Sequence, residues 1–353
     1  MQLLTNHNLC HLIFARFFVH FFNLQLSPDC VELKYIGLRR CRVKNEVALL
    51  VKEKLNCRVL GFEKIGRGAS AEVYKAAVDL PQSAIAVKVC KNSNLAFEEY
   101  ERINFISSRV DCKLPRLYFV AKSGDCGVLV MELLEGCEAS AKSLLFMPNK
   151  KKLANEIIDN LIKIHSVHSD KFGSVENAVY DTWLDYYGEF ANKIADFAEK
   201  SDVPNIVKKA VCEGLNSLSK LLGGNTGEPT LIHGDYWMPN FIINPKNAEL
   251  VGVVDPFNVM WAEPEYELFG LTVGCGKRLQ LYDIYKSKVK TSPYCDVKIE
   301  LYALFNELYW YKTLGKIDFG YLKYRSRRLL KELAKINQKS NSLNLFDMHF
   351  MRE

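Results

Sequence analysis

The sequence predicts an α+β protein built as two lobes, a small β-rich N-terminal lobe and a larger helical C-terminal lobe. Short strand-like runs punctuated by Gly and Pro fall between residues 58 and 133, whereas from residue 143 onward the apolar side chains recur mainly at helical spacing. The length of 353 residues also suits two domains or one two-lobed unit. We therefore expect a ligand cleft between the two lobes.

The predicted N-terminal lobe covers residues 43–134. It begins with a short amphipathic helix and holds one further helix among five strands. The helices are expected at 46–55 and 95–108, and the strands at 58–63, 72–77, 84–90, 116–121 and 127–133.

Residues 1–42 are expected to be a poorly ordered extension that folding and activity do not require. The run Leu12–Phe22 is apolar, but Arg16 and His20 interrupt it and no Lys or Arg precedes it. A secretory signal needs a positive segment before its apolar core, and a membrane-spanning helix needs about 20 apolar residues. We therefore expect no stable membrane insertion.

The predicted C-terminal lobe covers residues 135–338, with a tail at 339–353. Helices are expected at 152–165, 180–199 and 206–221. A Gly-rich break then precedes a β-hairpin pattern with an Asn-Pro-Lys-Asn turn at 244–247, and residues 264–337 return to helical spacing. His165 and His168 lack a third ligand nearby, so we interpret them as helix C-terminal histidines favoured by the helix dipole.

Composition argues against several classes of function. The 47 basic residues are interleaved with 41 acidic ones, for a net charge of +6, and no basic stripe with spaced aromatic residues occurs. A nucleic-acid partner is therefore not expected. The 11 cysteines are odd in number and show no C-x-x-C spacing, which argues against a zinc ribbon or a disulfide framework and for the reducing cytoplasm.

Two motifs in the N-terminal lobe suggest nucleotide binding. The stretch GRGASAEV could bring backbone N–H groups close to phosphate oxygens, although alone it also fits an ordinary tight turn; its candidate residues are Gly66, Gly68, Ala71 and Val73. Lys88 ends the next apolar strand, where burial is costly unless an anion meets the ammonium. Such a lysine would bind phosphates and pair with Glu98, Glu99 or Glu101 of the following helix, and we favour Glu99 because it lies near the apolar stripe.

A third motif could supply the chemistry of phosphoryl transfer. In HGDYWMPN, Asp235 is placed to accept a hydroxyl proton, and Asn240, five residues on, could hold a metal. Asp255 ends the neighbouring strand, so that it would lie beside Asn240 and complete a hard oxygen site suited to Mg²⁺. Each residue also has a plain structural interpretation, but these do not explain the order of all the motifs together.

The chain resembles the aminoglycoside phosphotransferase and fructosamine kinase group of the protein-kinase-like fold, from about Val43 to Leu333. The most specific stretch is LIHGDYWMPNFII followed by VVDPFNVMWAEPEYEL. The resemblance implies a bilobal kinase that uses ATP and Mg²⁺, with Asp235 as catalytic base, Asn240 and Asp255 as metal ligands and Lys88 on the phosphates. It also implies structural support from His233 and Glu267, and an adenine-binding hinge at Met131, Glu132 and Leu133.

Two positions depart from the protein-kinase pattern. Ala71 replaces the third Gly of the kinase loop, and Asp255 is followed by Pro-Phe, as in fructosamine kinases. The helical segment at 264–268 follows Asp255 so closely that no peptide platform fits, which favours a small acceptor. Acidic and aromatic side chains would suit a cationic, polyhydroxylated molecule such as a ketosamine or an aminoglycoside, and the candidate substrate residues are Asp181, Asp185 and Trp237.

Two other functions stay open at this point. One is a metabolite kinase similar to choline or homoserine kinases, which would differ only in its acceptor pocket. The other is a non-catalytic nucleotide-binding pseudokinase, against which the presence of Lys88, Asp235, Asn240 and Asp255 argues.

Overall fold

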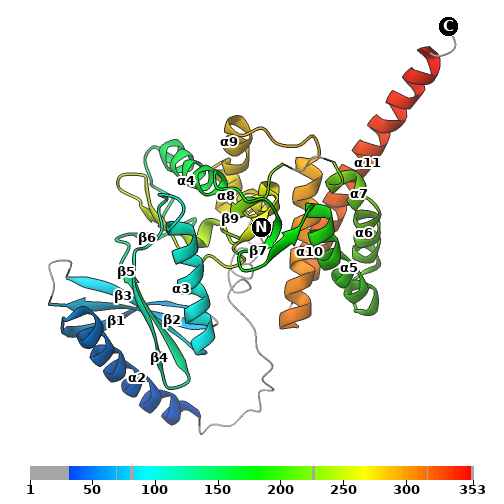
Figure 1. Ribbon diagram of the computed structural model, residues 1–353. Helices are drawn as coiled ribbons and strands as arrows, with labels where there is room; N and C mark the ends of the chain where they lie inside the picture. Colours follow the sequence, from blue (N-terminus) through cyan, green and yellow to red (C-terminus); the bar gives the residue numbers. More distant parts are fainter. Residues whose placement is uncertain (1–31, 69, 80–82, 225–226, 316, 351–353) are drawn as a thin grey trace, which may run out of the picture. The chain divides into compact units, whose positions relative to one another are not determined.

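The computed structural model describes residues 32–68, 70–79, 83–224, 227–315 and 317–350 (Figure 1). It divides into two compact units, which are considered separately. Of the described residues, those up to 164 and those at 235–257 form unit 1, and those at 165–234 and from 258 onward form unit 2. This boundary differs from the predicted lobes, because the first helix after residue 134 and the 235–257 segment group with the N-terminal sheet.

The main sheet of unit 1 has five antiparallel strands in the order β1-β2-β3-β5-β4. The strands match those predicted, with ends shifted by a few residues. They are β1 (Val59–Arg67), β2 (Ala71–Val78), β3 (Ala84–Cys90), β4 (Leu117–Ser123) and β5 (Cys126–Glu132).

A helix covers each face of this sheet, because the strands alternate apolar side chains between two sides. Helix α2 (Glu32–Leu55) packs Val47 and Val51 against the face that contains Val87 and Val130. Helix α3 (Ser93–Ser107) packs against the other face, and Figure 1 shows the two helices on either side of the sheet. A side chain on Gly127 would lie 2.5 Å from Ala96 Cβ, so the close approach of α3 requires a glycine there.

Helix α2 is longer than expected from the sequence. It begins at Glu32, so residues 32–42, which we assigned to a poorly ordered extension, are helical. The segment contains no proline and only one glycine, Gly37, and nothing local therefore stops the helix from extending toward the N-terminus. The rest of the extension, residues 1–31, lies outside the described residues.

Unit 1 also contains the 235–257 segment and the elements that pack against it. A small sheet of β6 (Cys137–Glu138), β10 (Phe241–Asn244) and β11 (Glu249–Val253) has the order β11-β10-β6. The hairpin of β10 and β11 turns at 245–248, close to the predicted position. Helix α4 (Lys150–His165) and the short 3-10 helix η1 (Met238–Asn240) complete the unit.

Unit 2 is mainly helical, as the sequence predicted. Its helices include α5 (Trp183–Lys200), α6 (Asn205–Asn216), α7 (Leu218–Leu222), η2 (Pro264–Thr272), α8 (Gly274–Arg278), α9 (Leu281–Lys288), α10 (Cys295–Leu314) and α11 (Phe319–Phe350). A small sheet has the order β8-β7-β12-β9, from Ala178–Tyr180, Phe172–Ser174, Met260–Ala262 and Thr230–Ile232. The sequence analysis missed most of these short strands, which have too few residues for a period to show. Helix α11 also includes residues 339–350, which we had assigned to a tail.

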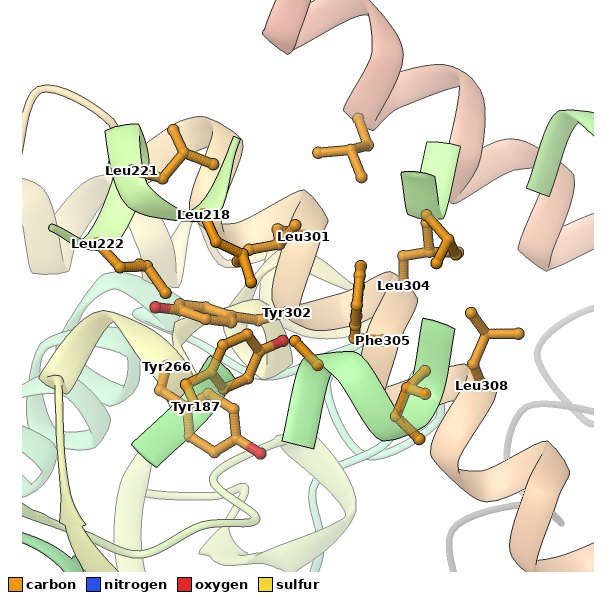
Figure 2. Packing of buried hydrophobic residues seen from close by; sticks show 14 of the residues in the cluster. Tyr187, Leu218, Leu221, Leu222, Tyr266, Leu301, Tyr302, Leu304, Phe305 and Leu308 are labelled. Carbon is orange, nitrogen blue, oxygen red and sulfur yellow. The ribbon is translucent and has the colours of Figure 1, made fainter. Parts of the chain in front are cut away.

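The core of unit 2 joins leucines of α7 and α10 to a group of aromatic rings (Figure 2). Tyr187, Tyr266 and Tyr302 meet edge to face, with ring centroids 4.9–5.9 Å apart. Such geometry adds to the free energy gained from burial of the rings. Among the described residues, no helix is long and apolar enough to span a membrane.

Candidate active site

A buried lysine and two carboxylates form the centre of the candidate site in unit 1. Lys88 of β3 lies 2.6 Å from Glu99 Oε2 of α3, and its Nζ also contacts Asp255 Oδ1. Burial disfavours the Lys88 ammonium, but the carboxylates of Asp255 and Glu99 outweigh it and hold the Lys88 pKa above its usual value. The Lys88–Glu99 pairing that we favoured from the sequence is present, and the lysine is charged.

Glu99 differs from an ordinary surface glutamate in both pKa and hydrogen bonding. Burial raises the pKa of Glu99 to about 7, against the opposing effect of Lys88. Its Oε1 is buried and has no hydrogen-bond partner among the described residues. An acceptor of this kind inside a protein is costly unless a ligand or water satisfies it.

The glycine motif forms the turn between β1 and β2, next to the strand that carries Lys88. Gly66 lies opposite Val73 after an irregularity in the register, and Val73 lies opposite Lys88. The Gly68 amide donates to the Ala71 carbonyl at 2.8 Å, which closes the turn. Ala71 is buried against α3, so its methyl group contributes to packing where a kinase loop would have glycine.

The predicted hinge lies at the end of β5. Met131 is buried in the sheet, and the Glu132 amide donates to the Arg116 carbonyl at 2.8 Å. The Glu132 carboxylate in turn accepts the Arg116 amide at 3.1 Å. Leu133 is the first residue beyond the strand, so it stays the candidate for backbone contacts with an adenine.

Asp235 and Asn240 are held together by the tight 235–240 loop. Asn240 Nδ2 donates to the Asp235 carbonyl at 2.9 Å and to Asp235 Oδ2 at 2.8 Å. The Asn240 carbonyl accepts the Val254 amide at 2.9 Å, which places Asn240 beside the segment that ends in Asp255. The proton acceptor and the two metal ligands implied by the resemblance therefore come together in one unit.

The chemistry of these groups fits Mg²⁺. Asn240 Oδ1 is buried and has no hydrogen-bond partner among the described residues, so an acceptor oxygen is available for a cation. Asp255 adopts the left-handed conformation with φ of 58°, which is uncommon for residues other than glycine. Mg²⁺ typically takes one or two protein carboxylates together with substrate phosphates and water, and here Asp255 would supply the carboxylate and Asn240 Oδ1 a further oxygen ligand.

Glu267 supports the backbone that leads into the 235–240 loop. Its Oε2 accepts the Gly234 amide at 2.9 Å and its Oε1 accepts the His233 amide at 3.3 Å. His165 Nε2 lies 2.7 Å from the same Oε1, and His165 Nδ1 lies 2.9 Å from Tyr285 Oη. Gly234 has a φ of +79°, and a side chain there would lie 2.4 Å from the Asn258 carbonyl oxygen, so only glycine fits. His165 thus has specific side-chain partners, beyond the dipole effect inferred from the sequence.

The three candidate substrate residues have different surroundings. Asp181 is exposed and paired with Lys171. Asp185 lies in the first turn of α5, where its amide and carboxylate bond the capping hydroxyl of Thr182. Trp237 is buried. Their role in substrate binding stays a prediction.

Sequence reasoning missed several residues that contact the site. Tyr236, which directly follows Asp235, is buried and donates to the Ile157 carbonyl at 2.7 Å. The guanidinium of Arg102, on the same helix as Glu99, lies 5.3 Å from the ring centroid of Phe257. Phe257 follows Asp255 by two residues, but no local pattern in the sequence links it to Arg102.

Comparison with known proteins gives one family. The model of the phosphotransferase enzyme family, APH, matches residues 61–284. The protein YcbJ of Escherichia coli K12, itself uncharacterized, is 23% identical over 215 residues, which span 59% of this chain and 70% of YcbJ.

Solved structures share the fold. A protein assigned as a fructosamine-3-kinase from Haemophilus somnus 129PT aligns with a TM-score of 0.60 and 14% identity, over 80% of this chain and 96% of that one. A thermostable mutant of the aminoglycoside phosphotransferase APH(4)-Ia, in ternary complex with ADP and hygromycin B, aligns with a TM-score of 0.62 and 16% identity, over 82% and 98%. The predicted protein-kinase-like fold is thereby confirmed, as is the predicted resemblance.

Proposed function

Because the chain belongs to the phosphotransferase enzyme family, we propose that it is an ATP- and Mg²⁺-dependent kinase that acts on a hydroxyl group of a small amine-bearing molecule. The acceptor class proposed is that of ketosamines and aminoglycosides. The observation that carries the proposal is the meeting of Lys88, Glu99, Asp235, Asn240 and Asp255 within one unit. Similarity to a protein assigned as a fructosamine-3-kinase and to an aminoglycoside phosphotransferase supports this acceptor class.

In the proposed reaction the acceptor hydroxyl oxygen attacks the γ-phosphorus of ATP. The hydroxyl proton passes to the Asp235 carboxylate, the bond between the γ-phosphorus and the β–γ bridging oxygen breaks, and ADP leaves. The hydrogen bond from Asn240 fixes the orientation of Asp235, and Lys88 neutralises charge on the phosphates. Mg²⁺, held by Asn240 and Asp255, would add positive charge beside the β- and γ-phosphates.

The test is an ATP-consumption screen over ketosamines, aminoglycosides, choline and sugar amines. We expect turnover with an amine-bearing polyol, and Asp235→Ala should lower that turnover by a factor on the order of 10²–10⁴ because the proton acceptor is lost. ATP binding by this variant should survive, since Asp235 does not hold the nucleotide. Asp196→Ala is the matched control, because Asp196 is exposed on α5.

Each outcome of the screen separates the proposal from its rivals. Turnover with choline alone would indicate a choline kinase-like enzyme, and binding of ATP without turnover would indicate a pseudokinase. Full activity of Asp235→Ala on the true acceptor would show that Asp235 is not the base.

A further inference from the structure

Asn160 of α4 links two parts of the site that are far apart in the sequence. Its side chain is buried, and its Oδ1 accepts the backbone N–H of Lys113 at 2.6 Å. Its Nδ2 donates to the hydroxyl of Tyr236 at 3.4 Å. One amide group thus contacts both the loop between α3 and β4 and the 235–240 loop. All these residues belong to unit 1.

The contact of Asn160 with Tyr236 leads to the proton acceptor. Tyr236 directly follows Asp235, and its hydroxyl donates to the Ile157 carbonyl of the same helix α4 at 2.7 Å. Its ring packs against Phe241 with centroids 4.8 Å apart. Because the phenol is fixed at both its ring and its hydroxyl, the backbone of Asp235 is held against α4.

The contact of Asn160 with the Lys113 amide leads to the metal ligand. The Lys113 carbonyl accepts the Val253 amide at 2.8 Å, and Lys113 Nζ donates to the Leu250 carbonyl at 2.6 Å. Lys113 Nζ also lies 3.1 Å from Glu156 Oε2, on α4. The backbone of Lys113 is therefore hydrogen-bonded to the last residue of β11, Val253. Val253 lies two residues before Asp255, so this bond fixes the backbone that leads to the metal ligand.

We propose that Asn160 is a positioning residue, which holds Asp235 and Asp255 at a fixed separation through these two contacts. The inference rests on the proposed function, because it assigns Asp235 and Asp255 their roles in phosphoryl transfer. Proton transfer and phosphate binding must occur in one geometry, and a displacement of about 1 Å at a distance from the chemistry can cost 10²-fold in rate. A buried amide that serves as both donor and acceptor is suited to fix such a distance, since loss of either bond leaves a polar group unsatisfied.

The test compares Asn160→Ala with the control Asn155→Ala. Asn155 is on the same helix, and its Nδ2 donates to the Lys151 carbonyl within that helix. We expect Asn160→Ala to lower kcat by about 10- to 100-fold, with less than about a threefold change in the KM for ATP, because the nucleotide contacts stay in place. The control should keep wild-type kcat. Melting temperatures of both variants are measured alongside.

Two further variants separate positioning from stability. Tyr236→Phe removes the hydroxyl, and with it the bonds to Asn160 and to the Ile157 carbonyl, and should lower kcat by a smaller factor. The double variant with Asn160→Ala should fall by less than the product of the two single factors, because the two changes share the Asn160–Tyr236 contact. Asn160→Asp keeps the acceptor for the Lys113 amide and should recover part of the kcat. If Asn160→Ala does not fold, Tyr236→Phe and Asn160→Asp carry the test.

The outcomes distinguish this inference from the proposed function. If the wild type is active and Asn160→Ala keeps its kcat, the positioning role alone is overturned. The same holds if kcat falls and KM rises in proportion to the loss of melting temperature. A wild type without turnover on any acceptor of the screen overturns the proposed function and this inference with it.

Discussion

Two buried lysines, one in each unit, lie between pairs of carboxylates. Lys88 of unit 1 contacts Glu99 and Asp255. Lys298 of unit 2, on α10, lies 2.6 Å from Glu263 Oε1 and 3.1 Å from Glu265 Oε2. The charges are the same, but their surroundings differ.

In unit 2 the carboxylate oxygens are satisfied within the protein. Ser292 donates its amide and its hydroxyl to Glu265, and Tyr302 donates to Glu263 Oε2 at 3.3 Å. Trp183 Nε1 extends the network by donating to Tyr302 Oη at 2.9 Å. This cluster is closed, with side-chain exposures of 2%, 1% and 7% for Lys298, Glu263 and Glu265.

In unit 1 the cluster of Lys88, Glu99 and Asp255 is more exposed and has unsatisfied acceptors nearby. The side chain of Asp255 is 22% exposed, and the buried oxygens Glu99 Oε1 and Asn240 Oδ1 have no partner among the described residues. The comparison teaches that a lysine between two carboxylates can belong to the scaffold or to a site, and that access and unsatisfied acceptors distinguish the two. The same substitution should therefore lower mainly the activity at Lys88 and mainly the stability at Lys298.

The largest effect is expected on activity, from Lys88→Met. Removal of the ammonium should lower turnover by roughly 10²–10³-fold, because charge on the transferred phosphoryl group loses a fixed partner. The fold should survive, since Glu99, with its pKa raised to about 7, can take up a proton when Lys88 is absent. Turnover and thermal unfolding of the variant check both statements. A Lys88→Met variant that is much less stable but keeps its specific activity would contradict this difference between the two lysines.

The next largest effect is expected on stability, from Lys298→Met. Loss of one partner from a buried ion pair costs about 3–5 kcal/mol. The stranded charge here is Glu265, which is ionised because the effect of burial is outweighed by Lys298 and the Ser292 amide, which hold its pKa below the usual value. We expect a clear shift of the urea unfolding midpoint, while the folded fraction keeps its specific activity. Lys286→Met is the control, since Lys286 pairs with Asp296 at a more exposed position and should contribute at most about 1 kcal/mol. Equal stability of Lys298→Met and the control would contradict the scaffold role.

A smaller effect concerns the pH dependence of stability. Burial raises the pKa of Glu263 to about 8, with Glu265 adding to the shift and Lys298 opposing it. The protonated form is favoured in the fold, so its contribution to stability is complete below the ordinary value of 4.5 and is lost as pH rises through about 8. Glu263→Gln should be nearly as stable as the wild type at pH 6 and should lose less stability than the wild type between pH 6 and pH 9. Unfolding midpoints at the two pH values check this, and identical slopes would show that Glu263 is ionised in the fold.

Much of the fold followed from local patterns. The strands of unit 1 have alternating or continuous apolar runs between Gly and Pro residues, and Lys88 was conspicuous as a charged residue within such a run. The spacing of Asp235 and Asn240 also carries over, since a tight loop brings residues five apart into contact. These features depend on neighbours in the chain.

Features that depend on distant partners were not predicted. Asn160 lies in the helical stretch NEIIDNLIKIH, where it reads as an ordinary polar residue, yet its partners are 47 and 76 residues away. His165 ends the same helix, but its bond to Glu267 spans 102 residues. The two units also divide the chain at other points than the expected lobes, since α4, which lies in unit 1, contacts β11 across 94 residues of sequence.

We propose that the cluster of Lys88, Glu99 and Asp255 in unit 1 binds a nucleotide together with Mg²⁺. The most direct measurement is a titration of ATP, with and without Mg²⁺, into the wild type and into Asp255→Asn. The account predicts that Mg²⁺ tightens ATP binding by the wild type, and that Asp255→Asn loses this Mg²⁺ dependence while its melting temperature stays unchanged or rises, since one of two neighbouring carboxylates is neutralised. Equal ATP affinity with and without Mg²⁺ in the wild type, or an undiminished Mg²⁺ effect in Asp255→Asn, would contradict it.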